Sequence, residues 1–147
     1  ALAQGKGKDG GRMHDVTISI DRVRATTKID ALSQPDFYAR VTINGVRVAT
    51  TPVPNKADIS PNWVVTNPVP AGVADVKVEI LDKDIQQDDP IDINRVVNKR
   101  DLDFKVNTRS CRISGFNPEY RCGAKITRAG DDARKAAEIT FTVTVKK

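Results

Sequence analysis

An antiparallel β-sandwich of about eight strands is the fold that this sequence predicts, and three observations lead to it. Apolar and polar residues alternate through six short segments, so that each segment has one apolar and one polar face. Proline-containing stretches separate these segments, and Asn44-Gly45 is the strongest short-range signal for a hairpin turn. No amphipathic helix is evident, because only 131–138 has helical composition and it is short enough to be one turn in a loop.

The first segment illustrates the alternation that defines these strands. Val16, Ile18 and Ile20 fall on one face, whereas Thr17 and Ser19 fall on the other. Strands of this kind bury one face and expose the other, as antiparallel sheets commonly do. In chain order, the predicted strands are 16–21, 37–43, 46–48, 76–81, 102–106 and 139–145, and the predicted turns between them include 51–62, 67–72 and 116–119.

The chain of 147 residues is expected to form one domain over residues 13–147, long enough to bury its own core. Residues 1–12 are rich in glycine and lysine and are expected to be a flexible tail. Ala1-Leu2-Ala3 is similar to the end of a secretory signal peptide, which favours a secreted or periplasmic location. No apolar run is long enough to span a membrane as a helix.

The two cysteines favour the same location. Cys111 and Cys122 are separated by a stretch that contains glycine and proline, which suits a disulfide across neighbouring strand ends in an exported protein. Closing this loop would stabilise the fold by about 3 kcal/mol on the chain-entropy model. A zinc site needs further ligands, and the single histidine, His14, lies far away in the sequence beside the expected tail.

The basic charge does not predict a nucleic-acid-binding protein. The formal charge is +5, but lysines and arginines are scattered, and aromatic residues make up only 5% of the chain. Single-strand binders need aromatic stacking platforms and groove-reading proteins need a basic helix, and neither is evident. The charge therefore predicts a solvated basic face, which could also attract an anionic membrane surface.

Carboxylates are nevertheless concentrated within 81–92, directly after a predicted strand. Such a cluster repels itself unless a counterion neutralises it, and Ca²⁺ takes about six to eight oxygen ligands, more than one short loop supplies. A second acidic loop, 30–36, precedes the strand 37–43, and two such loops can share one end of an antiparallel sandwich. The two loops together contribute Asp30, Asp36, Asp82, Asp84, Asp88 and Asp89.

At these residues the sequence resembles the C2 domains, which are β-sandwiches that bind calcium and phospholipid. The resemblance covers residues 13–97. It rests on Asp30 and Asp36 with the following "FYARV", on Pro61 and Trp63, and on "VKVEILDKD" followed by "DDPIDI". The region 13–97 as a whole is similar to a divergent, bacterial, exported member of that family. The segments after residue 97 have the strand character of the last strands of such a domain.

The resemblance implies that Asp30 and Asp36 are the first-loop calcium ligands, that Asp82 and Asp84 form the D-x-D pair, and that Asp89 closes the site. The sequence departs from the family pattern at Pro35, which precedes Asp36. It also departs at Asp92, where the family has glycine. Because the second loop is one residue short, Asp88, Asp89 and Asp92 remain alternatives for the closing ligand.

The D-x-D sequence and Trp63 can also be explained without a binding function. A D-x-D sequence at a strand end is also common in solvated loops that form Asx turns. Trp63 is expected to pack in the core, with a sugar-stacking platform as the alternative. No exposed hydrophobic pair is evident at the predicted loop tips.

Catalytic motifs are absent: the chain has no G-x-S-x-G, no H-E-x-x-H and no P-loop. The sequence therefore predicts a non-catalytic C2-like module that binds Ca²⁺ and bridges to phospholipid or another anionic surface. The alternatives are a metal-free module for a protein or carbohydrate partner and a carbohydrate-binding sandwich with structural calcium. The last of these would depend on Trp63 or Tyr38.

Overall fold

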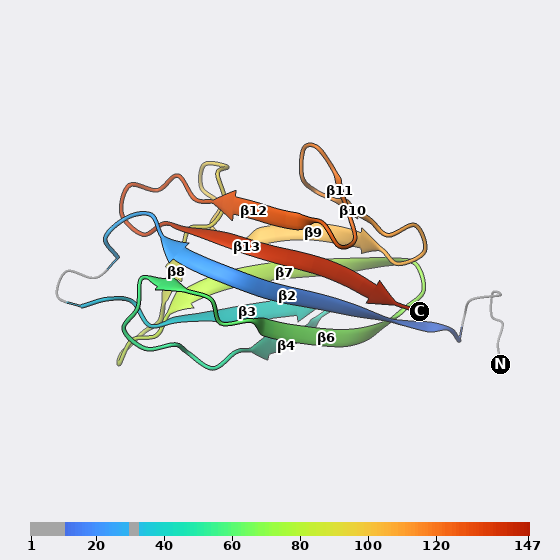
Figure 1. The fold of residues 1–147 in the computed structure, drawn as a ribbon, viewed down its shortest axis with the longest axis horizontal. Coiled ribbons are helices and arrows are strands. Elements are labelled where there is room, and N and C mark those ends of the chain that lie inside the picture. The colour runs from blue at the N-terminus through green and yellow to red at the C-terminus, as the bar shows by residue number, and fades with distance from the viewer. Residues whose placement is uncertain (1–10, 30–32) are drawn as a thin grey trace.

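The computed structural model describes residues 11–29 and 33–147. Two antiparallel sheets pack face to face (Figure 1). The spatial order of the seven-stranded sheet is β11 (Tyr120–Arg121), β10 (Arg112–Ser114), β9 (Leu102–Asn107), β7 (Val73–Asp82), β3 (Phe37–Ile43) and β4 (Val46–Ala49), and β8 (Asp89–Ile91) pairs with β7. The five-stranded sheet runs β12 (Lys125–Ala129), β13 (Ala137–Lys146), β2 (Met13–Ala25) and β5 (Asp58–Ile59), and β6 (Trp63–Pro70) pairs with β2.

The alternating pattern places the core as the sequence predicts. Val16, Ile18 and Ile20 are fully buried on the inner face of β2, and Phe141 is fully buried on β13, which pairs with β2. Burying a side chain of this size stabilises the fold by about 1.5–3 kcal/mol relative to exposing it. The described residues form no helix, and none of their segments could cross a membrane as one. The β-sandwich prediction is therefore confirmed.

The predicted strands and the Asn44-Gly45 turn are confirmed, with longer bounds for several strands. Both turn residues have positive φ, 48° and 83°, and they join β3 to β4. Eight strands in the described residues have four or more residues, and four shorter ones supplement them. The segment 131–136 is a loop with no helical turn, and β13 begins directly after it.

The prediction of a turn at 67–72 is wrong over most of its length. Asn67 to Pro70 form the second half of β6, in register with β2. Within the described residues β6 pairs with β2 alone, so it is an edge strand, and prolines are tolerated on edges because a missing N–H there breaks no ladder. The proline content of 67–72 therefore predicts a turn where the chain forms a strand.

The single histidine is buried near the start of the first long strand. His14 is 2% exposed at the start of β2, and its Nδ1 lies 2.8 Å from Thr108 Oγ1, which accepts a hydrogen bond from Gly72 N. Its Nε2 has no hydrogen-bond partner among the described residues. Residues 1–10, including the signal-like Ala1-Leu2-Ala3, lie outside the described residues, as does Asp30.

The predicted disulfide is present between Cys111 and Cys122, whose Cα atoms are 5.3 Å apart. It closes the β10–β11 hairpin, where Cys122 N also donates a hydrogen bond to Cys111 O. Phe116 from this hairpin packs on Phe104 of β9, with the ring centroids 5.3 Å apart. The disulfide therefore closes the hairpin on itself, and the pairing of β10 with β9 and the Phe116–Phe104 contact hold it to the edge of the seven-stranded sheet.

Asp92 joins the two sheets at the end that carries the predicted acidic loops. It is 4% exposed, and its carboxylate accepts hydrogen bonds from the backbone N–H groups of Asn94, Asp131 and Asp132. Its own backbone N–H donates to Lys135 O, and its carbonyl accepts from Ala137 N. These contacts tie the 92–101 loop to the 130–136 loop.

Gly130 allows this close approach. A Cβ atom at this position would lie 2.1 Å from the carbonyl oxygen of Asp92, closer than any real contact. The 130–136 loop can therefore reach Asp92 only with glycine at this position.

We expect Asp92→Ala to lower the free energy of unfolding by about 3 kcal/mol, because it leaves three backbone donors without their charged acceptor. Urea denaturation followed by fluorescence of Trp63 measures this. Asp131→Ala removes a nearby exposed carboxylate and is the matched control, with an expected change within about 0.5 kcal/mol. Equal effects of the two substitutions would contradict this role for Asp92.

Candidate functional site

Five loop segments gather at the end of the sandwich opposite the chain termini, and we call this the loop end (Figure 1). It consists, within the described residues, of 26–29, 33–36, 50–57, 83–88, 92–101 and 130–136, the first two being parts of one loop. It contains Asp36, Asp84 and Asp88, and it adjoins Asp82 at the end of β7 and Asp89 at the start of β8.

Asp36 and Asp82 meet at the loop end. Asp82 is the last residue of β7, and its partner in register is Phe37, so the antiparallel pairing brings it beside Asp36. The backbone N–H of Asp36 donates to Asp82 Oδ1 over 2.8 Å. Asp82 is 2% exposed. The expectation that the two acidic loops share one end is therefore correct for these two residues.

Asp36 also links a third segment. Its Oδ1 accepts a hydrogen bond of 2.6 Å from Asn55 N, and its carbonyl accepts one from Lys83 N. Asn55 Oδ1 in turn accepts from Gln34 N. Asp36 therefore acts as a connector between the 33–36, 50–57 and 83–88 segments.

Asp84 and Asp88 shape the 83–88 loop from within. Asp88 Oδ1 accepts a hydrogen bond from Asp84 N, and Asp84 Oδ1 accepts one from Ile85 N. Asp88 Oδ2 accepts a 2.5 Å hydrogen bond from the Tyr38 hydroxyl and lies 3.7 Å from Lys83 Nζ. The hydrogen bonds from Asp84 N and then from Tyr38 lower the pKa of Asp88. This loop is thus stabilised by its own backbone donors and by a lysine.

The carboxylates of Asp89 and Asp92 contact groups outside the 83–88 loop. Asp89 belongs to β8, in register with Asp82, and its carboxylate lies 2.9 Å from Lys135 Nζ. The treatment of 89–91 as part of a loop is therefore wrong, because these residues pair with β7. The Asp92 carboxylate faces the buried backbone amides described above, which explains how the chain uses an aspartate at that position.

The carboxylates that the sequence singles out therefore do not converge as a group. Within residues 11–29 and 33–147, no three His, Cys, Asp or Glu side chains lie close enough together to hold a metal ion. Asp36 and Asp82 are joined by a backbone-to-carboxylate hydrogen bond, whereas Asp84, Asp88 and Asp89 are directed to backbone donors, Tyr38 and two lysines. Asp30 lies outside the described residues.

Exposed apolar side chains at the loop end are the residues that sequence reasoning missed. Ile85 is 99% exposed in the 83–88 loop, and Val96 and Val97 are 54% and 73% exposed in the 92–101 loop. The available signal was an adjacent apolar pair enclosed by charged and amide residues, in "NRVVNKR". The exposed basic side chains of the same loops are Lys83, Arg95, Lys99 and Arg100.

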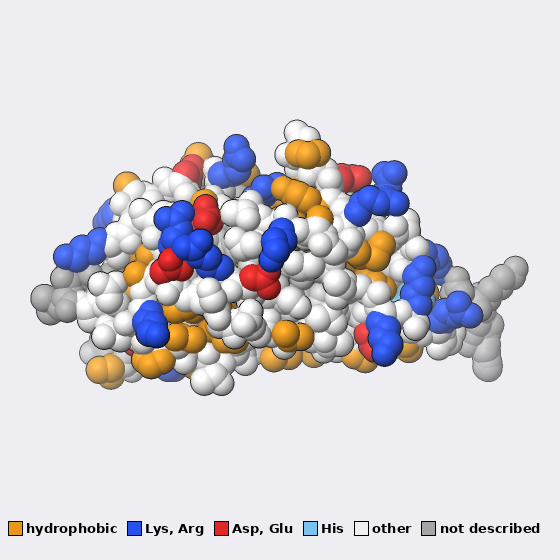
Figure 2. All heavy atoms as spheres, viewed as in Figure 1, with side chains coloured by type: hydrophobic (Ala, Val, Ile, Leu, Met, Phe, Trp, Pro, Cys, Tyr) orange, Lys and Arg blue, Asp and Glu red, His pale blue; other side chains and the backbone are white. Residues whose placement is uncertain are grey.

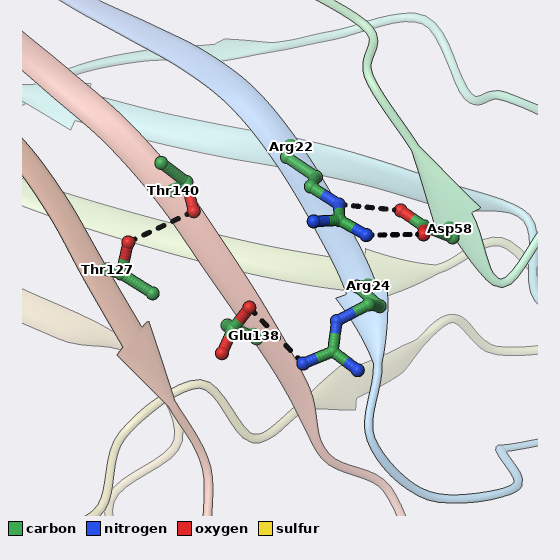
Figure 3. Close-up of polar contacts among 6 residues, drawn as sticks. All are labelled: Arg22, Arg24, Asp58, Thr127, Glu138 and Thr140. Atoms are coloured by element: carbon green, nitrogen blue, oxygen red, sulfur yellow. Dashed lines mark hydrogen bonds and ion pairs between the residues drawn. The ribbon is translucent and has the colours of Figure 1, made fainter.

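The outer face of the five-stranded sheet is, by contrast, internally neutralised. Arg22 donates two hydrogen bonds to Asp58, and Arg24 pairs with Glu138 at 3.3 Å (Figure 3). The hydrogen bonds from Arg22 lower the pKa of Asp58. Figure 2 shows acidic side chains beside basic ones over this face. The loop end is therefore a better candidate than this face for contact with an anion.

The two aromatic residues considered as sugar platforms are not available as flat exposed surfaces. Tyr38 is 7% exposed, and its hydroxyl is bonded to Asp88. Trp63 is partly buried and packs against the hydrophobic core, as the sequence predicts.

No protein-family model and no curated protein matches the sequence, but solved structures match the fold. A C2 domain protein from Ramazzottius varieornatus matches with a TM-score of 0.58 and 11% identity, over 92% of this chain and 89% of that one. The calcium-bound pair of C2 domains from extended-synaptotagmin 2 matches with a TM-score of 0.55 and 11% identity, over 88% of this chain and 45% of that one.

Human GIVD cytosolic phospholipase A2, in complex with a fluorophosphonate inhibitor and terbium chloride, also matches. The TM-score is 0.57 at 15% identity, and the match covers 92% of this chain but only 17% of the phospholipase. At such low identities these matches establish the fold. The chain is thus a C2-like β-sandwich, as the resemblance in its sequence predicts.

The contact between Tyr38 and Asp88 gives a titration test of this geometry. Burial, together with the hydrogen bond to Asp88 and its negative charge, raises the pKa of Tyr38 from 10.0 to about 12. The native state therefore holds this proton more tightly than the unfolded chain, and the associated stability is lost as the pH rises from 10.0 to about 12.

We expect Asp88→Asn to lower the pKa of Tyr38 but to leave it above 10.0, because burial is the larger cause. Alkaline titration of tyrosinate absorbance measures this, and Tyr38→Phe identifies the signal by removing it. An unchanged Tyr38 pKa in Asp88→Asn would show that the two side chains do not interact.

Proposed function

We propose that this chain is a non-catalytic C2-like module that docks on anionic phospholipid surfaces through its loop end. The observation that carries the proposal is the exposure of Ile85, Val96 and Val97 in two loops that also present basic side chains. Apolar tips among cations match the boundary between anionic headgroups and acyl chains.

The energies involved are sufficient for reversible binding. Full burial of an isoleucine or valine side chain contributes about 1.5–3 kcal/mol, and a lysine or arginine near an anionic surface contributes about 1 kcal/mol. These gains are offset by the cost of association, so they support transient docking better than permanent anchoring. Docking in this form needs no metal ion, because lysines already accompany Asp88 and Asp89.

The available nucleophiles and bases support a non-catalytic role. The single histidine of the chain is buried at the start of β2, at the end opposite the loops, and both cysteines are joined in the disulfide. Nucleophilic catalysis needs a base oriented beside the nucleophile. Neither imidazole nor thiolate chemistry is accessible at the loop end.

A second candidate function is calcium-dependent docking, and the adjacency of Asp36 and Asp82 favours it. The ligands would be Asp30, Asp36, Asp82 and Asp84, with Asp88 or Asp89. Binding through Asp88 would require the Lys83–Asp88 ion pair to open, and binding through Asp89 would require the Lys135–Asp89 ion pair to open. One fold neighbour, extended-synaptotagmin 2, is described as calcium bound, which supports testing this candidate.

We expect Ile85→Ser/Val97→Ser to weaken binding to vesicles of phosphatidylserine and phosphatidylcholine at least about tenfold, because two inserted apolar side chains are lost. Cosedimentation in the presence of chelator measures the affinity. Val46→Ser/Val64→Ser is the matched control, since these valines are 49% and 63% exposed on β4 and β6. Similar losses in both variants, or no binding by the unaltered protein, would refute docking through these tips.

Thermal unfolding in chelator and in millimolar calcium tests the second candidate, with Asp82→Asn/Asp84→Asn alongside. Calcium-dependent docking predicts a stabilisation of about 2.7 kcal/mol at a hundredfold excess over Kd, absent in the variant. An unchanged midpoint in the unaltered protein would remove this candidate and leave metal-free docking.

A further inference from the structure

A cavity of about 460 Å³ lies between the 92–101 loop and the Gly115–Asn117 segment of the disulfide-closed hairpin. Figure 1 shows these two segments rising on either side of β12. The lining includes Arg95, Lys99 and Arg128, the apolar Val96 and Phe116, and the amide of Asn117. It lies outside the acidic loops and is used by none of the contacts described for them.

The charge of this cavity is uncompensated. Most basic side chains on the sheets have a carboxylate partner, as Arg40 has in Glu79 and Lys77 in Asp101. Across the described parts of the chain, the three cations of the cavity form no ion pair with a carboxylate. Asp103 is the one acidic residue among the lining residues. With Arg95, Lys99 and Arg128 it gives the lining a net charge of +2.

Arg128 is held in place for recognition of an anion. Its guanidinium carbon lies 4.9 Å from the centroid of the Phe116 ring and 5.3 Å from that of Tyr120. Its Nη1 donates to Thr127 O over 3.0 Å. A guanidinium stacked on aromatic rings keeps its planar fork of donors oriented, and such forks match the oxygens of phosphate.

Both walls of the cavity are fixed. On one side, Asn94 cross-links the 92–101 loop, since its Oδ1 accepts from Val96 N and its Nδ2 donates to Asp101 O. On the other, a Cβ atom at Gly115 would lie 3.1 Å from Phe104 Cα, so the hairpin is pressed against β9. The cations therefore stand around a preformed space.

We propose that this cavity binds a phosphate monoester carried on a polyol ring. A phosphate monoester has a charge of about −1.5 to −2 at neutral pH, which matches the net charge of the lining. Phosphate alone would leave most of the volume empty, whereas Val96, Phe116 and the Asn117 amide suit the mixed apolar and hydroxyl surface of a ring. Such a ligand can be a soluble sugar phosphate or the headgroup of a phosphoinositide.

Titration calorimetry with myo-inositol 1-phosphate tests the site directly. We expect saturable binding that neutral myo-inositol does not reproduce, and that Arg95→Ser/Lys99→Ser weakens at least about tenfold through loss of charge-assisted hydrogen bonds. Arg128→Lys keeps the charge but removes the fork, so it should weaken binding as well. Arg47→Ser/Lys146→Ser removes the same charge from exposed positions elsewhere and should leave the affinity unchanged.

Three results would overturn the proposal: no saturable binding at millimolar ligand, equal binding of neutral inositol, or equal losses in the two double variants. Vesicle binding then distinguishes a lipid headgroup from a soluble sugar phosphate as the ligand. Only this vesicle experiment rests on the proposed docking function. Stronger binding to phosphatidylinositol 4-phosphate than to phosphatidylserine at equal surface charge, lost in Arg95→Ser/Lys99→Ser, would assign a lipid headgroup. Calorimetric binding without that preference would assign a soluble phosphate, and it would stand even if vesicle docking failed.

Discussion

The buried carboxylate of Asp92 is the constraint on which the loop end depends. Its three backbone donors belong to two loops that are almost forty residues apart in sequence, and they hold these loops at a common point. A neutral acceptor could bond the same amides, but charge-assisted hydrogen bonds are roughly twice as strong. Lys135, which pairs with Asp89, and the exposed Val96 and Val97 belong to the two loops that meet at this point.

Asp92 also explains why a basic chain concentrates carboxylates in one region. Asp36, Asp84, Asp88 and Asp92 each accept backbone N–H groups that loops leave without partners. A buried or half-buried backbone donor without an acceptor is costly, so aspartates in turns replace the ladder that ordinary strands provide. Most of the local negative charge is therefore directed to backbone amides and lysines within the protein.

The strand pattern was predictable because burial enforces a period of two. The segments around Ile18, Val41 and Phe141 each have one buried face, and each forms a strand where the alternation indicates it. Proline content at 67–72 misled the prediction, because composition does not reveal that one side of a strand has no neighbour. The burial of His14 could not be predicted from the sequence, because it depends on Thr108 and Gly72, which are distant in sequence.

The candidate site was predictable only in part. Resemblance located the loop end and brought Asp36 and Asp82 together correctly, since strand register determines their positions. The orientation of Asp84, Asp88 and Asp89 was not accessible, because it is decided by Tyr38, Lys83 and Lys135 through packing. The exposed Val96-Val97 pair had a local signal in its charged and amide neighbours, but the cavity beside Val96 depends on how a loop and a hairpin face each other, which no local pattern encodes.

The prolines of β6 have a consequence for the behaviour of this domain at high concentration. An unpaired strand edge invites another chain to extend the sheet, and that is a route to aggregation. Pro68 and Pro70 have no N–H, so the second half of β6 lacks donors at alternate positions along the open edge. The same residues that disguise this strand in the sequence therefore protect the folded protein from edge-to-edge association.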